Sequence, residues 1–93
     1  RVPTEGQAHH PQLAVLADGR VLLAWDESGT GTRRIVSAAG QVGDDGRVTF
    51  NRRPLNEVGS YPVVVPAAPN EWLVLWTAGE PARSVIRGAR LPR

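Results

Sequence analysis

Two adjacent carboxylates, Asp26 and Glu27, are the first residues of this sequence whose types could do chemistry. A pair of carboxyl groups can serve as acid and base, or as acid and nucleophile, in the hydrolysis of a glycosidic bond. Neighbours in sequence, however, need not have the spacing that this reaction requires across a sugar. We therefore expect a solvated strand end at this position and assign no catalytic residue.

The histidines His9 and His10 form a second candidate pair, because imidazole is a common ligand of Zn²⁺. Adjacent residues on an extended chain point to opposite sides, so both rings rarely reach one ion unless symmetric copies add ligands. The sequence holds 2 His and no Cys, which leaves no further ligand of these types. We predict no metal and no cofactor, with one imidazole packed at the entrance of its strand and the other in solvent.

The charge balance argues against a polyanionic partner. All 11 cations are Arg, against 9 acidic residues, for a formal net charge of +2. The doublets Arg33-Arg34 and Arg52-Arg53 are interspersed with acids, whereas nucleic-acid binders concentrate cations on one face. We predict no nucleic-acid partner, and a solvated edge for Arg33 and Arg34. No apolar run approaches the roughly 20 residues that a membrane-spanning helix needs, so we expect no membrane span.

Short apolar runs between turn signals must position these candidates. The 8 Pro and 10 Gly leave no window long enough for a helix, and Val, Leu and Trp fill the gaps between them. Tight turns are expected at Ala17-Asp18-Gly19 and Asp45-Gly46. The predicted strands are Pro11–Leu16, Arg20–Trp25, Arg33–Ala38, Arg47–Asn51, Pro62–Val65, Glu71–Thr77 and Ser84–Arg90.

An internal repeat with an offset of 51 residues organises these strands. Residues 1–42 and 52–93 share 8 identities in 42 positions, where unrelated sequences would share roughly three. The identical pairs are Arg1 with Arg52, Pro3 with Pro54, Pro11 with Pro62, Ala17 with Ala68, Leu22 with Leu73, Trp25 with Trp76, Ile35 with Ile86, and Ala38 with Ala89.

A repeat of about 50 residues with four short strands is typical of a β-propeller blade. The predicted fold class is all-β: two four-stranded antiparallel blades, the second without its outer strand. Residues 1–9 form a closing or linker segment, 10–60 the first blade and 61–93 the second. Open edges and bare faces favour association, so we expect a larger propeller made from one chain or from identical chains. A small independent β-sandwich is the alternative architecture.

The tryptophans could stack on sugar rings, but their repeat positions favour packing. Trp25 and Trp76 occupy the same position of the repeat, and Trp72 corresponds to Val21. Equivalent large apolar residues in tandem blades fill the gap between blades, where each buries on the order of 200 Å². We expect all three side chains in the core.

Two segments carry a resemblance to a known family. The sequence from His10 to Val15, followed by that from Asp18 to Glu27, resembles a blade of the sialidase-like (BNR-repeat) propellers. The second half repeats it more loosely in Tyr61–Val65 and Trp72–Trp76. Family blades often carry an Asp-box, S-x-D-x-G-x-T-W, and Gly43–Phe50 is similar to it with one extra residue between Gly and Thr.

The resemblance implies a scaffold or a ligand-binding module, with carbohydrate as a possible ligand and an exported location. Sialidases of this kind have six blades, which would take three copies of two. A fragment of a sialidase-like glycoside hydrolase is the alternative function. Tyr61 has no evident Glu as its base, and Arg1-Val2-Pro3 only distantly resembles the family's Arg-Ile-Pro motif. A complete active site is therefore not predicted.

The propeller interpretation places one group of loops on a single face, where ligands usually bind in such folds. This face gathers residues 3–9, 26–32, 54–60 and 78–83. Its candidate ligand-binding residues are His9, His10, Asp26, Glu27, Arg33, Arg34, Tyr61 and Arg83.

Overall fold

The computed structural model describes residues 6–28, 32–67, 70–79 and 84–92, and the regular structure in these residues is entirely β-strand. The prediction of an all-β chain is therefore confirmed. The strands are β1 (Gln7–Val15), β2 (Arg20–Ser28), β3 (Arg33–Val42), β4 (Val48–Val58), β5 (Ser60–Ala67), β6 (Glu71–Ala78) and β7 (Val85–Pro92).

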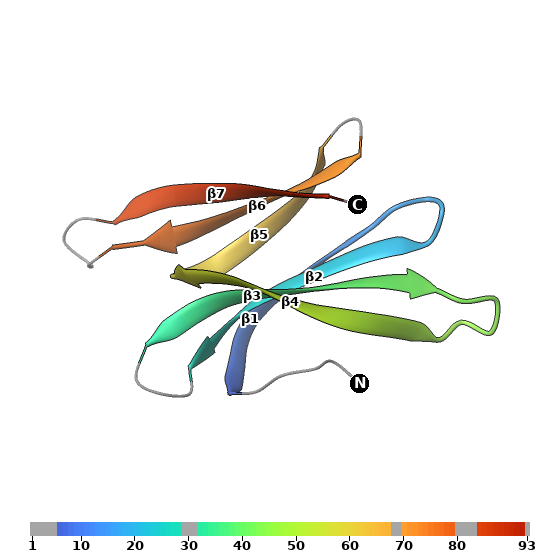
Figure 1. Ribbon diagram of the computed structural model, residues 1–93, viewed down its shortest axis with the longest axis horizontal. Coiled ribbons are helices and arrows are strands. Elements are labelled where there is room, and N and C mark those ends of the chain that lie inside the picture. The colour runs from blue at the N-terminus through green and yellow to red at the C-terminus, as the bar shows by residue number, and fades with distance from the viewer. Residues whose placement is uncertain (1–5, 29–31, 68–69, 80–83, 93) are drawn as a thin grey trace.

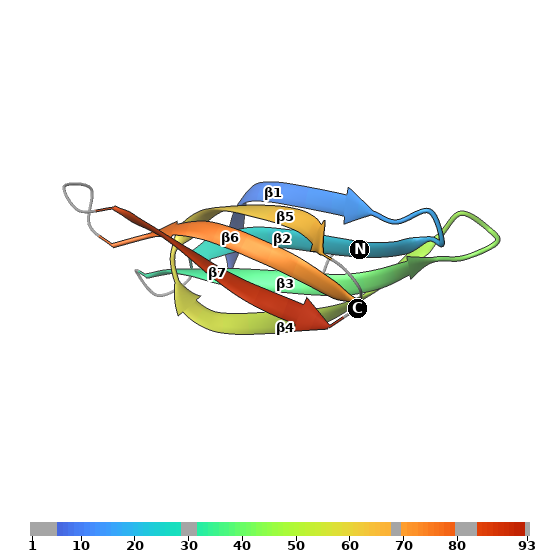
Figure 2. The ribbon, with the colours of Figure 1, turned by 90° about the horizontal axis from the view of Figure 1, so that it is seen from above.

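The strands form two antiparallel sheets in which neighbours in sequence are neighbours in space. The first sheet has the order β1-β2-β3-β4 and the second has the order β5-β6-β7. Figure 1 shows the second sheet lying above the first, and Figure 2 shows from above how its strands pass over those of the first. Strand β5 is next to the first sheet and contacts both β1 and β2.

Prolines explain why several strands are longer than the sequence predicts. Proline has no backbone N–H for the ladder, so it is tolerated at edges and bulges. Pro11 lies in a register shift between His9 and Gln12, and β1 extends through it instead of starting there. Pro54 lies at the shift where β4 passes Ile35 and Val36, and this strand runs on to Val58.

The offset of 51 residues also relates the backbones of the two sheets. The pairing of Leu13 with Leu23 recurs as that of Val64 with Val74, and the shift between His9 and Gln12 recurs between Ser60 and Val63. The residues in these two bulges have positive φ angles, 53° at His10 and 55° at Tyr61. The first and second halves of the chain therefore adopt the same local structure, bulge included.

The main core lies between the two sheets. Leu22, Ala24 and Ile35 of the first sheet pack with Trp72, Val74 and Trp76 of the second. A second cluster, which comprises Leu23, Trp25, Val36 and Ala38 with Phe50 against it, lies on the other face of the first sheet. The expectation that all three tryptophans are buried is confirmed.

The β1–β2 turn forms as the sequence predicts. Gly19 has φ +87°, a conformation that glycine adopts without steric cost. The carboxylate of Asp18 accepts hydrogen bonds from the backbone N–H of Arg20 at 3.1 Å and from its Nε at 2.7 Å. The side-chain hydrogen bond from Arg20 is the largest cause that lowers the pKa of Asp18 below its ordinary value of 3.8.

Candidate functional site

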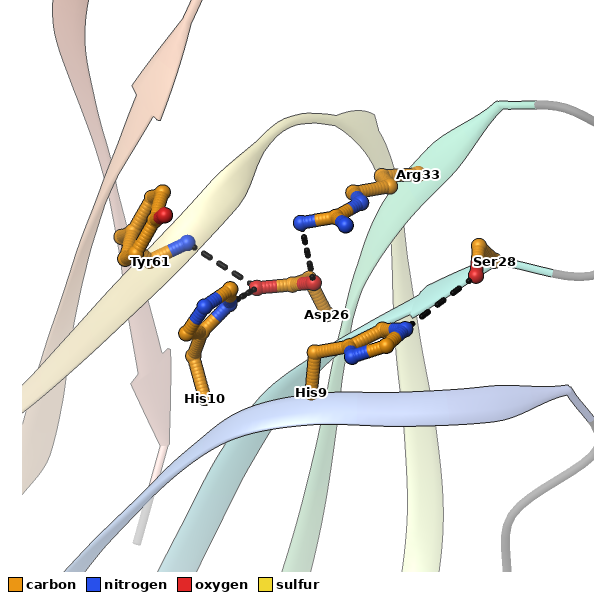
Figure 3. A network of polar contacts seen from close by, with 6 residues as sticks. All are labelled: His9, His10, Asp26, Ser28, Arg33 and Tyr61. Carbon is orange, nitrogen blue, oxygen red and sulfur yellow. Dashed lines mark hydrogen bonds and ion pairs between the residues drawn. The ribbon is translucent and has the colours of Figure 1, made fainter.

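A polar cluster forms at the end of the molecule where β1 and β5 begin and β2 ends. We call it the Asp26 cluster; it consists of Asp26, His10, Arg33 and Tyr61 (Figure 3). The Asp26 side chain is fully buried, and its Oδ2 lies 2.8 Å from Nδ1 of His10. The same oxygen accepts the backbone N–H of Tyr61 at 3.0 Å. Asp26 thus connects both sheets through a single carboxylate oxygen.

The second oxygen of Asp26 has weaker contacts. Its Oδ1 lies 3.6 Å from Nη1 of Arg33, which is an ion-pair distance and too long for a hydrogen bond. No described residue donates a hydrogen bond to this buried oxygen. Because a buried acceptor without a donor is costly, the Arg33 guanidinium provides the main compensation for the charge on this side.

The two bulges bring His10 and Tyr61 together. Their ring centroids are 3.9 Å apart with an interplanar angle of 32°. A positive φ at a non-glycine residue is uncommon, and here it occurs at both members of the contact. The rings come from different sheets but from the same position of the repeat, so the contact joins equivalent points of the two halves.

Glu27 belongs to the opposite face of the first sheet. Its Oε1 accepts a hydrogen bond from the indole Nε1 of Trp25 at 2.8 Å, and its Oε2 accepts one from Nη2 of Arg52 at 2.7 Å. Asp26 and Glu27 are exposed by only 0% and 6%, so the predicted solvated strand end is wrong. The reason is that successive strand residues alternate between faces, and each carboxylate is buried on its own face by the side chains that contact it. This alternation also separates the two carboxylates, which do not form an acid–base pair.

The remaining sequence candidates lie around the Asp26 cluster or outside the described residues. His9 is half-buried, with Nε2 3.4 Å from Oγ of Ser28, and its ring centroid is 6.0 Å from that of His10. His10 is also half-buried, so the expected division into a packed and a solvated imidazole is wrong. Arg34 is exposed, as predicted, but it lies on β3 between β2 and β4 and not at an edge, and Arg83 lies outside the described residues.

Sequence reasoning missed two residues whose side chains contact the buried Glu27 carboxylate. Arg52 was read only as part of a charge doublet, although its guanidinium holds buried Glu27. Trp25 was expected in the core without a polar role, although its N–H reaches the residue two positions further along β2. The alternation of residues along β2 was the available signal for the second contact, since Trp25 and Glu27 share a face.

A cavity of about 320 Å³ opens beside the Asp26 cluster. The residues that line it include Arg33, Tyr61 and the hydroxyl residues Ser60, Thr77 and Ser84. This volume is at the lower end of the range of about 300–1,000 Å³ that is typical of small-molecule sites. Tyr61 is 59% exposed, which leaves ring surface for contact with a ligand.

No group of three or more His, Cys, Asp or Glu side chains in the described part of the chain is arranged to hold a metal ion. Within the same residues, no helix has the length and apolar character that crossing a membrane requires. The contacts that the Asp26 cluster shows are hydrogen bonds, an ion pair and an aromatic contact.

Comparison with known proteins finds no matching family model, no matching curated protein and no matching solved structure.

Proposed function

We propose that this chain forms two consecutive blades of a β-propeller and serves as a non-catalytic scaffold or ligand-binding module. The observation that carries the proposal is the way in which the two repeats stack. The first sheet presents Leu22 and Ala24 to the second, whereas the second presents Val74 and Trp76 to the first. Two copies of one repeat therefore use opposite faces for their contact.

The repeat offset makes this head-to-tail stacking explicit. The counterparts of Val74 and Trp76 in the first sheet are Leu23 and Trp25, which lie on the face away from the second sheet. A contact between unlike faces can be continued by further repeats, and it generates a closed ring when the rotation between repeats closes. A two-fold sandwich of equivalent faces would not have this property.

The arrangement of the first strands also supports a propeller. Strands β1 and β5 are equivalent in the repeat and lie in contact with each other. In a propeller, the first strands of successive blades lie side by side around the axis, and each blade then extends outward from them. The order β1-β2-β3-β4 agrees with this outward meander.

The mass of the chain in solution tests the proposal. We expect assemblies whose mass is a multiple of 10.0 kDa, with about 30 kDa for a six-bladed ring of three copies. Ile86→Arg should reduce assembly, because this residue lies on the outer face of the second sheet and is 70% exposed. Asp44→Arg, in an exposed turn, is the control. Light scattering that finds a compact 10.0 kDa monomer at every concentration would contradict the ring.

Ligand binding is proposed for the cavity beside the Asp26 cluster. A guanidinium, several hydroxyls and an exposed aromatic ring are the groups that hydrogen-bond and stack on carbohydrate. Binding to a glycan array should be lost in Arg33→Ala and Tyr61→Ala, while Arg47→Ala, on a hairpin turn, should keep the wild-type profile. An unchanged profile in all three variants would remove the cavity from consideration.

A further inference from the structure

Arg33 is the one charged residue among the described residues that line the cavity beside the Asp26 cluster. A guanidinium ordinarily recognises carboxylate or phosphate, because its fork of N–H donors matches their oxygens. The other lining residues with polar side chains carry hydroxyls, and they are Ser60, Tyr61, Thr77 and Ser84. Hydroxyls bind charged and uncharged ligands alike. The availability of the Arg33 charge therefore decides which of these two classes of ligand the cavity takes.

The charge of Arg33 is already opposed by that of Asp26. Nη1 of Arg33 lies 3.6 Å from Oδ1 of Asp26, and the two side chains are 44% and 0% exposed. Because the carboxylate is fully buried, solvent screens its charge much less than it screens the charge of a surface acid. A ligand that approaches Arg33 therefore also experiences the negative charge of Asp26.

The remaining contacts of Asp26 do not cancel its charge. Its Oδ2 lies 2.8 Å from Nδ1 of His10 and accepts the backbone N–H of Tyr61 at 3.0 Å, whereas Arg33 faces the other oxygen (Figure 3). A backbone N–H has no formal charge, and a histidine ring is ordinarily uncharged at about pH 8. The charges of Arg33 and Asp26 then sum to zero at that pH.

A carboxylate on a ligand in this cavity would interact with both members of the Arg33–Asp26 pair. Its attraction to Arg33 is opposed by its repulsion from Asp26, so the cost of removing the ligand's charge from water has little compensation. A sugar hydroxyl carries no such cost and still accepts a hydrogen bond from a guanidinium N–H. Tyr61, which is 59% exposed, adds aromatic surface for the apolar face of a sugar ring.

We propose that Asp26 determines the specificity of this cavity and makes it select uncharged carbohydrate over carbohydrate that carries a carboxylate. The inference rests on the ligand binding proposed for the cavity and names the class of ligand. Asp26 is not among the residues that line the cavity, so it acts through Arg33 and is not itself a binding residue.

A glycan array printed with matched pairs of sugars tests this selection. The members of each pair differ only in whether the exocyclic carbon is a hydroxymethyl group or a carboxylate, as in glucose with glucuronate, galactose with galacturonate and mannose with mannuronate. In the pair that binds best, we expect the uncharged member to bind at least about tenfold more tightly than the acidic member at about pH 8. This comparison uses the unmodified chain.

Asp26→Asn tests whether the carboxylate is the cause, since asparagine has nearly the same size without the charge. Arg33 should then attract a ligand carboxylate without opposition, and the preference for the uncharged sugar should fall at least about tenfold. Glu27→Gln is the matched control, because it removes the same charge from the next residue, whose contact with Arg52 lies on the opposite face of the first sheet. Its preference should stay within about twofold of the wild-type value. Circular dichroism checks that both variants are folded.

The outcomes distinguish this inference from the proposed function. A preference for the uncharged sugar that is lost in Asp26→Asn and kept in Glu27→Gln supports the inference. Equal or tighter binding of the acidic sugars by the wild-type chain, or a preference that folded Asp26→Asn leaves unchanged, overturns the inference but leaves ligand binding standing. An absence of binding to every printed sugar overturns both. If Asp26→Asn does not fold, the wild-type comparison alone decides the inference.

Discussion

Trp25 and Trp76 allow a test of the duplication and of a buried polar contact at once, because they occupy equivalent positions but have different partners. The indole N–H of Trp25 donates to Glu27 at 2.8 Å. The indole nitrogen of Trp76 is buried and has no hydrogen-bond partner among the described residues, and Ala78 stands at the position equivalent to Glu27. Replacing either residue by Phe removes the same atoms from a ring that is 1% or 2% exposed.

Only one of these replacements removes a hydrogen bond. A hydrogen bond to a charged group contributes about 1.5–3 kcal/mol, so Trp25→Phe should lower the free energy of unfolding by about that much more than Trp76→Phe. Removal of the unpaired N–H of Trp76 relieves a desolvation cost and widens the difference. Each kcal/mol corresponds to about 4–8 °C in a domain of this size, which predicts a melting temperature at least about 6 °C lower for Trp25→Phe.

Urea denaturation followed by far-UV circular dichroism is the appropriate assay, because both variants lose a fluorophore. The slope of the free energy with urea should stay the same in both, so that the midpoints report stability alone. Repeating the pair in a Glu27→Gln background should shrink the difference, since the charged acceptor is then absent. Losses that are equal to within about 0.5 kcal/mol in the wild-type background would refute the assigned contact.

Three further changes test other contacts. Asp26→Ala should cost about 3–5 kcal/mol in the free energy of unfolding, because it leaves the Tyr61 N–H and Arg33 without their shared carboxylate. The control, Asp44→Ala at an exposed position, should change the free energy of unfolding by no more than about 0.5 kcal/mol in the same chemical denaturation. Gly59→Ala should lower the free energy of unfolding by about 1–3 kcal/mol, because a Cβ there would collide with the Trp76 ring and lie 2.9 Å from the carbonyl oxygen of Thr77. Thermal unfolding measures the effect, and a wild-type melting temperature would contradict this packing. Asp18→Asn should destabilise the chain at neutral pH. Arg20 lowers the pKa of Asp18 in the folded state, so the Asp18 carboxylate stabilises the fold above its ordinary pKa of 3.8, and this stabilisation is lost as pH falls through the lowered pKa. The melting temperatures of variant and wild type should therefore converge in acid. A constant difference down to low pH would argue against the pairing of Asp18 with Arg20.

Burial at the Asp26 cluster is where sequence reasoning and structure differ most. The carboxylates at 26 and 27 follow a run of apolar residues, and a strand end in solvent is the ordinary fate of such a pair. Here both carboxylates at the end of β2 are buried, and each pairs with its own cation, Arg33 for Asp26 and Arg52 for Glu27. Which cation meets which acid depends on the register of β3 and β4, which local sequence does not encode.

The bulges at His10 and Tyr61 show a similar division. Proline at positions 11 and 62 reveals that both strands depart from a regular ladder, and the repeat shows that they do so at equivalent places. The contact between the two rings, however, requires that β5 lie against β1 and β2. Sequence reasoning therefore selected both residues as candidates without predicting that they touch.

The amino-acid order by itself determined the all-β character, the approximate places of the strands and turns, and the tandem relation between halves, because alternation, turn residues and a fixed offset are properties of nearest neighbours and of spacing. Only the tertiary structure decided which face of each sheet meets the other, and hence which polar groups are buried together. The physical reason is that a strand has two faces of similar apolar content here, so the choice between them is made by the packing of a second sheet rather than by anything within the strand.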